Sequence, residues 1–190
     1  MGREEGIYFD IKDYGSLVRR FSAITIDMAF LLLLFILAGA LWSLLFIPPD
    51  LDLAYYYGIK VFIYFEPEFF SLCLILAYIY LAILKPRPIR TIGYRLTGLK
   101  IIDLKGEQPS LLKMTWRFVL LAFGPFHLLF DIFWLGGDDN RQSLRDKLAG
   151  TYVIRKNAIP SGRGTIGYSQ YGLFCYQLIF SEVMRKKGTG

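Results

Sequence analysis

The chain has 190 residues, of which 54% are hydrophobic and 20% charged, and its formal net charge is +6. No basic run is interleaved with stacking aromatic residues, so we expect no nucleic-acid partner. Membrane proteins collect Lys and Arg in their cytoplasmic loops, which explains the same charge.

Two long apolar runs predict transmembrane helices. Residues 21–47 carry one charge, Asp27, and residues 69–84 carry none. A helix rises about 1.5 Å per residue and the hydrocarbon layer is about 30 Å thick, so about 20 apolar residues span it. The second run reaches that length when Pro67, Glu68 and Lys85 are counted at its ends. The first run is too long, and too far from the N-terminus, for a cleavable signal peptide.

The basic residues predict how the chain is oriented. Four Lys and Arg residues precede the first run, residues 48–68 hold four acidic residues against one base, and seven Lys and Arg residues lie within residues 85–113. Lys and Arg concentrate in cytoplasmic segments. We therefore expect a multi-pass plasma (inner) membrane protein with a cytoplasmic N-terminus, and residues 48–68 outside. Its cytoplasmic face would meet anionic head groups of the bilayer.

Two short segments predict a small cytoplasmic β element. Residues 95–105 read RLTGLKIIDLK and residues 151–155 read TYVIR, and both are rich in β-branched residues. Each needs a partner strand. If they pair with each other, both must lie on the same side of the membrane.

A third hydrophobic segment, residues 111–135, is expected to be broken at Gly124-Pro125. Basic residues follow it, so we prefer a re-entrant hairpin, and a kinked full span that places the C-terminus outside is the alternative. In the hairpin, Arg117 and Asp131 reach similar depths and can pair. His127, near the tip, fits a hydrogen-bonded interior residue better than a metal ligand, and a proton-relay role ranks lower.

The tail differs from the rest of the chain. Residues 160–164 read as a linker, and the apolar residues 171–184, followed by three basic residues, predict an interfacial helix. Residues 162–167 match GxGxxG, but too little chain follows to build a dinucleotide-binding unit. We expect a membrane domain over residues 1–156 and a linker with a C-terminal interfacial helix over residues 157–190. The predicted fold class is thus an all-α integral membrane protein with two transmembrane helices, a third broken or re-entrant segment and the small β element.

Arg20 and Asp27 are seven residues apart and share one helix face. A carboxylate at that depth costs about 2.5–3.5 kcal/mol, so Asp27 should face protein or water and have a partner. We favour a structural role, and a proton or cation site is the alternative. No residue pattern predicts catalysis, a metal site or a cofactor, so we expect no enzyme.

Three stretches together resemble the RDD family of bacterial membrane proteins. They are residues 20–27 (RFSAITID), 91–103 (TIGYRLTGLKIID) and 141–151 (RQSLRDKLAGT), and the resemblance covers about residues 14–156. It implies that Arg20 and Asp27 are the family's arginine and first aspartate, and that Asp146 is the second. Where the family often has Lys, this chain has Tyr94. Transport is suspected for the family, and cation/proton antiport is attributed to some members.

Two functions fit these features. We expect a non-catalytic subunit or scaffold of a membrane assembly, because the chain is small and has an apolar tail beyond the family region. The alternative is a cation/proton transporter, with Asp27 as the ion site and Arg20 and Asp146 setting its charge. Transport sites usually form between repeats, which this chain lacks, so a transporter would act as an oligomer. Homo-oligomers or other membrane proteins are therefore the expected protein partners.

Overall fold

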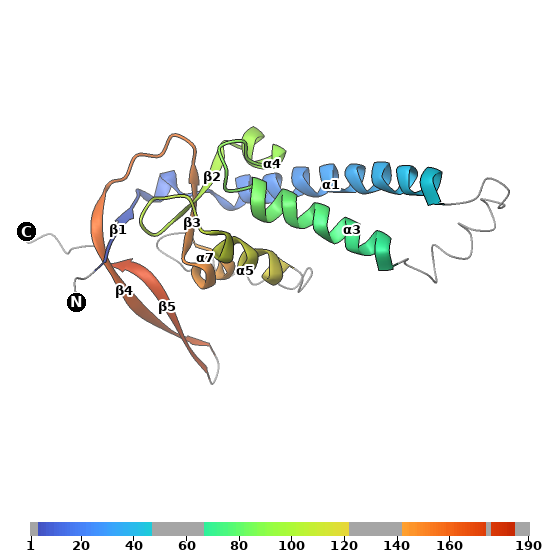
Figure 1. Cartoon of the computed structure of the whole chain (residues 1–190). Coiled ribbons are helices and arrows are strands. Elements are labelled where there is room, and N and C mark those ends of the chain that lie inside the picture. The colour runs from blue at the N-terminus through green and yellow to red at the C-terminus, as the bar shows by residue number, and fades with distance from the viewer. Residues whose placement is uncertain (1–3, 47–66, 122–141, 174–175, 185–190) are drawn as a thin grey trace, which may run out of the picture.

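The computed structural model describes residues 4–46, 67–121, 142–173 and 176–184. Two helical rods extend from an end that contains the strands (Figure 1). The first is α1 (Leu17–Phe46), and the second is α3 (Pro67–Tyr78), which continues as the π-helix η2 (Ile79–Leu84). The rods contact each other at Trp42 and Phe69, whose ring centroids lie 5.9 Å apart. The helix predicted for the second apolar run is confirmed and begins at Pro67.

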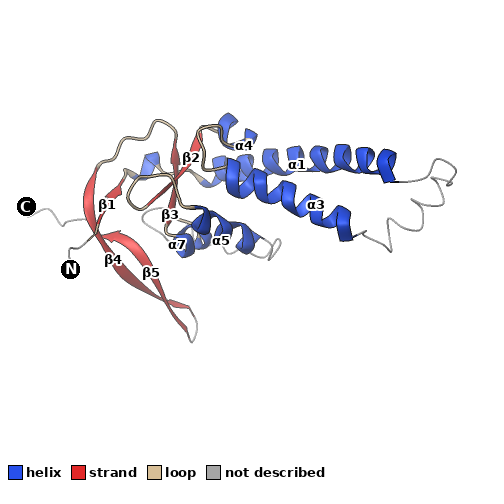
Figure 2. Cartoon of the chain, in the orientation of Figure 1, coloured by secondary structure: helices blue, strands red, loops and turns tan. Residues whose placement is uncertain are grey.

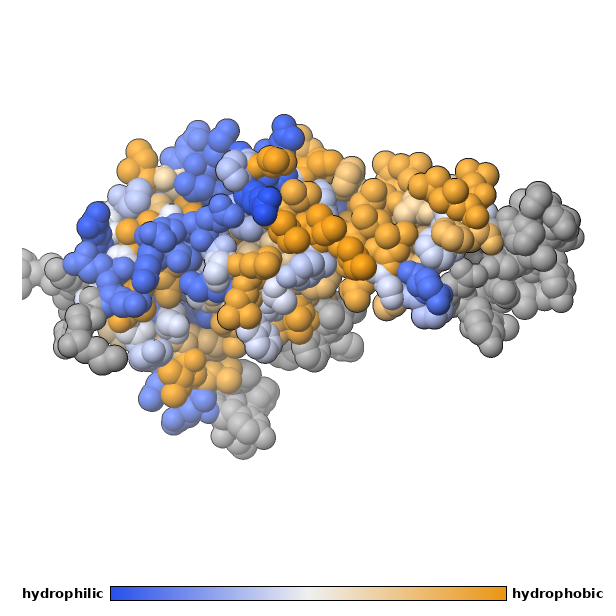
Figure 3. Space-filling view, in the orientation of Figure 1, coloured by the Kyte–Doolittle hydropathy of each residue, from blue (hydrophilic) through white to orange (hydrophobic). Residues whose placement is uncertain are grey.

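The two rods are the apolar runs predicted to cross a membrane. Both are long and apolar enough to do so, and only 6% of the most apolar part of α1 and 17% of that of α3–η2 are buried. The core helix of a soluble protein would be mostly covered. Leu44 of α1, for example, is 81% exposed. Hydrophobic side chains form most of the visible surface of the rods, and hydrophilic ones gather mainly toward the strand-containing end (Figure 3).

The smaller sheet confirms the predicted strand pairing. Strand β2 (Leu99–Asp103) pairs antiparallel with β3 (Thr151–Arg155), with Ile101 opposite Val153. The strand is shorter than the predicted residues 95–105, because α4 (Ile92–Leu96) precedes it. Gly98, with φ +66°, reverses the chain between the two elements in the left-handed region that favours glycine.

The larger sheet shows that the predicted all-α fold class is wrong. Its strand order is β1-β4-β5, formed by β1 (Glu5–Tyr8), β4 (Gly162–Leu173) and β5 (Tyr176–Met184) (Figure 2). The predicted interfacial helix over residues 171–184 is therefore wrong, because its described residues belong to a β-hairpin whose first strand begins within the predicted linker. Tight backbone packing explains a glycine here, because a Cβ on Gly164 would clash with the carbonyl oxygen of Met184.

The two sheets share one core. Buried side chains from the N-terminal segment, from β3 and from β5 meet there, including Phe9, Tyr14, Tyr152, Ile154 and Val183. The N-terminal segment crosses this core through a short 3-10 helix, η1 (Ile11–Asp13), and an isolated bridge from Tyr14 to Ile154. Chain segments on both sides of the family-like region are thus packed together at one end of the rods.

Two further helices complete the described part of the chain. Helix α5 (Leu111–Leu121) opens the third hydrophobic segment and packs against η2, and α7 (Leu144–Ala149) packs against α5 and against β3, into which it leads. The proposed break at Gly124-Pro125, and with it the choice between hairpin and full span, lies outside the described residues. His127 and Asp131 lie outside them as well.

Candidate functional site

Asp27 is fully buried and is surrounded by donors from the second rod and α4. Its Oδ1 accepts hydrogen bonds from the backbone N–H of Gly93 at 2.8 Å and the hydroxyl of Tyr80 at 3.0 Å. Its Oδ2 accepts one from the Thr91 hydroxyl at 2.9 Å and lies 3.4 Å from the ammonium of Lys85. The two carboxyl oxygens thus have four donors around them. Asp27 thus ties three segments together.

The local backbone explains how these donors converge. The π-helical turns of η2 place residues five apart on one side, so Tyr80 and Lys85 both reach the same carboxylate. Helix α4 can approach α1 because residue 93 is glycine. A Cβ there would clash with the carbonyl oxygen of Ala23 and lie 2.7 Å from Asp27 Oδ1.

Asp146 forms the second charged centre. It is fully buried, and its two oxygens accept hydrogen bonds from the guanidinium groups of Arg20 and Arg117. Arg20 also donates through Nε to the carbonyl oxygen of Gly15 at 2.9 Å, and Arg117 donates to the hydroxyl of Thr151 at 2.6 Å. Asp146 therefore joins α1, α5 and the start of β3.

The sequence around Asp146 fixes its position. Ser143 and Asp146 form a reciprocal capping box at the start of α7, and Gly150 ends that helix in the left-handed conformation. Burial alone would raise the pKa of Asp146. The positive charges of Arg117 and Arg20 outweigh it and hold the pKa of this carboxyl below its usual range. Asp146 is therefore ionised at neutral pH.

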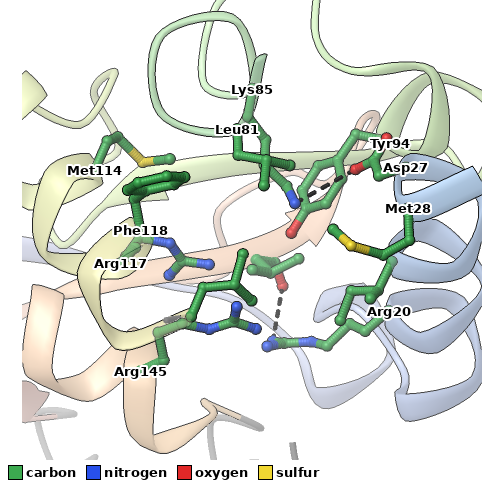
Figure 4. A pocket seen from close by; sticks show the side chains of 13 residues that line it. Arg20, Asp27, Met28, Leu81, Lys85, Tyr94, Met114, Arg117, Phe118 and Arg145 are labelled. Carbon is green, nitrogen blue, oxygen red and sulfur yellow. Dashed lines mark hydrogen bonds and ion pairs between the residues drawn. The ribbon is translucent and has the colours of Figure 1, made fainter. Parts of the chain in front are cut away.

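An open pocket lies between the two centres and is lined by residues of both. Figure 4 shows Arg117 and Arg145 on one side of this pocket, Arg20 reaching in from the other side, and Lys85 pointing toward Asp27 and Tyr94. The Lys85 ammonium lies 4.4 Å from the centre of the Tyr94 ring, a cation–π contact. Burial lowers the pKa of Lys85 to about 8; Asp27 opposes this shift, and Arg145 and Arg117 add to it.

The predicted site residues fall into different groups from those expected. Arg20 and Asp27 share a helix, but each has its own partners, and Arg20 is joined to Asp146. Arg117, predicted to face Asp131, also contacts Asp146. The described part of the chain holds no group of three or more His, Cys, Asp and Glu side chains placed to bind a metal.

The sequence model of the RDD family matches residues 14–150, which include both charged centres. The chain belongs to the RDD family. No curated protein and no solved structure gives a significant match. Family membership and the two exposed apolar rods together make this RDD protein a membrane protein.

Sequence reasoning missed several partners in this RDD protein. Thr91 and Gly93 lie in a stretch that carries the family resemblance. The resemblance marked this stretch but did not indicate that it contacts Asp27. No sequence pattern pointed to Tyr80, because a single hydroxyl group in an apolar run does not differ visibly from the lipid-facing residues around it. Lys85 was expected at the helix end, and the structure places its ammonium 3.4 Å from Asp27 Oδ2.

Proposed function

We propose that this RDD protein is a non-catalytic subunit that holds a membrane assembly together. The observation that carries the proposal is that both family carboxylates are occupied by donors of the same chain. Asp27 has three hydrogen bonds and a lysine, and Asp146 has two arginines. Groups held in this way act as structural ties between elements. Breaking a buried pair costs about 3–5 kcal/mol, which suits a permanent tie.

The larger sheet offers a surface for a partner. Within the described strands β5 lies at the edge, and Ile179 and Tyr168 on the hairpin are 60% and 76% exposed. An edge strand is a template for adding a strand from another chain. The partner proposed for this face is therefore a second protein, or another copy of this chain, that contributes an extended segment.

The basic residues support the orientation of this surface. We place both sheets and both termini in the cytoplasm, because Lys and Arg concentrate on the segments that adjoin them. The pairing of β1 with β4 supports a common side for the two ends of the chain. Anionic head groups would then lie next to the sheet-containing end.

Photo-crosslinking in native membranes tests the subunit proposal. A photoreactive residue at position 179 should give one discrete adduct, and the adduct partner should also remain bound in mild detergent. The same residue at position 163, whose side chain is 80% exposed but lies on β4, is the matched control. A monodisperse protein without adducts at position 179 would contradict the proposal.

Proton-coupled cation transport is the second candidate. It is favoured by one observation: Asp27 and Lys85 face each other at the wall of an open pocket, and the pKa of Lys85 is lowered to about 8. A lysine of this kind exchanges its proton close to physiological pH. The carboxylate would then be released to a cation when Lys85 loses its proton.

Liposomes that contain only this protein separate the two candidates. Transport predicts cation-driven proton flux that is abolished by Asp27→Asn and kept by Asp10→Asn, which changes an exposed carboxylate. The subunit proposal predicts no flux from the wild type. Flux that survives Asp27→Asn would remove Asp27 from any transport mechanism.

A further inference from the structure

The segment that joins the second rod to β2 lies at the base of both rods, with α4 beside the start of α1 (Figure 1). Lys85, at its start, lies 3.4 Å from Asp27, and Thr91, just before α4, donates a hydrogen bond to the same carboxylate. The 19 residues of α1 that follow Asp27, up to Phe46, extend about 29 Å along the helix axis. A hydrocarbon layer about 30 Å thick that covers them leaves Asp27 and its partners at the level of the lipid head groups.

The same segment carries positive charge that no acidic neighbour in the sequence balances. Residues 85–102 hold five Lys and Arg residues and no Asp or Glu. Arg87 and Arg95 are both exposed, and within the described part of the chain neither of them forms an ion pair. Exposed bases elsewhere do form one, as Arg163 does with Glu5 at 3.7 Å. The side chains around α4 therefore attract an anion that the protein itself does not supply.

Two exposed aliphatic side chains lie among these basic residues. Ile89 is 64% exposed and Leu96 is 71% exposed, and each is next to an arginine in the sequence. Segments that lie in a membrane interface combine the same two kinds of residue, because apolar side chains enter the acyl boundary while bases meet anionic head groups. A free anion in water would use the bases and leave the two aliphatic side chains without a contact.

Arg90, between these residues, has a backbone conformation that non-glycine residues rarely adopt. Its φ is +51°, in the left-handed region. Its Nη1 donates a hydrogen bond to the carbonyl oxygen of Leu99 at 3.2 Å, which ties the loop before α4 to the start of β2. With a longer contact from Nε to the carbonyl oxygen of Pro88, two of the five N–H donors of the guanidinium are used. The side chain is thus held in place with donors left for a phosphate oxygen.

We propose that the loop of residues 86–91 and α4 together bind the head groups of anionic lipids. Arg87, Arg90 and Arg95 provide the contacts to phosphate. Ile89 and Leu96 enter the acyl boundary beside them. Each base near an anionic membrane surface strengthens its attraction about fivefold. This inference goes beyond the proposed function and holds for either of its two candidates.

Native mass spectrometry of the full-length protein in a neutral detergent tests the head-group contacts. The probes are phosphatidylglycerol and phosphatidylcholine, which both contain a phosphate but differ in net charge. Phosphatidylglycerol should bind about tenfold more tightly or better, and inorganic phosphate at the same concentration should not displace it, because it makes no apolar contact. Equal binding of the two lipids, or displacement by inorganic phosphate, would overturn the proposal.

Charge-removing variants locate the surface. Arg87→Gln combined with Arg95→Gln should weaken the binding of phosphatidylglycerol about tenfold or more, because two exposed phosphate contacts are lost. Arg90 stays in place, since its contact with Leu99 also supports the loop. Arg163→Gln removes one such charge from a side chain that is 80% exposed on β4, and it should change binding less than about twofold. Equal losses in the two proteins would mean general attraction to basic residues and would overturn the proposal.

A fluorescent label tests the insertion of the apolar side chains separately. In a protein whose native cysteines are replaced by serine, the label is attached to Leu96→Cys or to Ile159→Cys, two positions that are 71% and 77% exposed. Residue 159 lies in the connection from β3 to β4, which runs away from the rods (Figure 1). In bilayer nanodiscs, lipids with a nitroxide near the glycerol group should quench the label at position 96 about twofold more strongly, or better, than at position 159. Equal quenching at the two positions would overturn the proposal.

Discussion

A charged residue near the end of an apolar helix can have a structural role or form a proton or cation site. The groups that contact it distinguish these two roles. At Asp27 the partners are a backbone N–H, two hydroxyl groups and an ammonium, which come from α4 and the residue before it and from η2 and the residue after it. The desolvation cost of the carboxylate is thereby offset by contacts that also hold α4 against α1. The same contacts explain why residue 93 has no side chain.

Gly93→Ala should destabilise the protein by about 1–3 kcal/mol, the usual cost of overpacking a core. The added Cβ meets the carbonyl oxygen of Ala23 and the Asp27 carboxylate, so α4 must move and lose its hydrogen bond to Asp27. Thermal unfolding in detergent measures the change. Gly39→Ala is the matched control, since its Cβ would meet Phe69 at an ordinary 3.4 Å, and it should not lower the melting temperature. Equal melting temperatures for the two variants would contradict the role given to Gly93.

Asp146 predicts a loss of stability in acid. Burial raises the pKa of Asp146, but the charges of Arg117 and Arg20 lower it by more than burial raises it. The folded-state pKa therefore lies below the unfolded value of about 3.9. Its contribution is therefore present above about pH 4 and is lost as the pH falls through the folded-state pKa. Asp146→Asn should cost about 3–5 kcal/mol at neutral pH, because two buried arginines lose their anion.

Unfolding measured from pH 7 to about pH 2 checks this prediction. Asp146→Asn should flatten the acid limb of the curve, and Asp10→Asn, at an exposed carboxylate, should leave it unchanged. A variant that is destabilised equally at every pH, with the acid limb intact, would show that another carboxyl governs acid unfolding.

At the scale of elements, the sequence predicted those helices and strands that follow from a local pattern, but not the pairings between distant segments. The two spans follow from uninterrupted apolar runs, and β2 with β3 follows from two β-branched segments that needed partners. Residues 171–184, which form the end of β4 and all of β5, were predicted as a helix, because this apolar run has helical length and no clear alternation. Its pairing with β1 joins residues from opposite ends of the chain, which no local pattern indicates.

The charged centres show the same limit. The family resemblance singled out Arg20, Asp27 and Asp146, yet it did not say which of them meet. Arg20 and Asp146 are 126 residues apart, and the contact depends on how α1, α5 and α7 pack. The nearer arrangement on one helix face, Arg20 with Asp27, was the natural expectation from spacing alone.

Gly164→Val should disrupt the larger sheet. A side chain at this position clashes with the carbonyl oxygen of Met184, so β4 and β5 must separate near the edge that β1 joins. A cost of about 1–3 kcal/mol is expected, together with faster amide exchange over residues 162–184. Tyr168→Val, at an exposed position of the same strand, is the control and should exchange like the wild type. If residue 164 belonged to a flexible linker, Gly164→Val would change neither stability nor exchange.

At the scale of the whole molecule, the strands place both ends of the chain at one end of the two rods (Figure 1). Strand β1 precedes α1, and β4 and β5 follow the third hydrophobic segment, yet all three form one sheet. A sheet cannot be divided by a bilayer, because its hydrogen bonds run directly from strand to strand. We therefore predict that strands β1, β4 and β5 all lie on one side of the membrane.

Cysteine accessibility decides this topology. Single cysteines at Ser16, Ser110 and Ser161 should react with a membrane-impermeant maleimide only after the cytoplasmic face is opened, because Lys and Arg concentrate there. A cysteine at Leu53, between the two spans, should react from outside in intact cells. The native cysteines are replaced by serine, and each variant must keep the wild-type melting temperature. Labelling of Ser161→Cys from outside would mean that the third segment spans the bilayer. That result would also separate β4 from β1 and exclude the larger sheet as described.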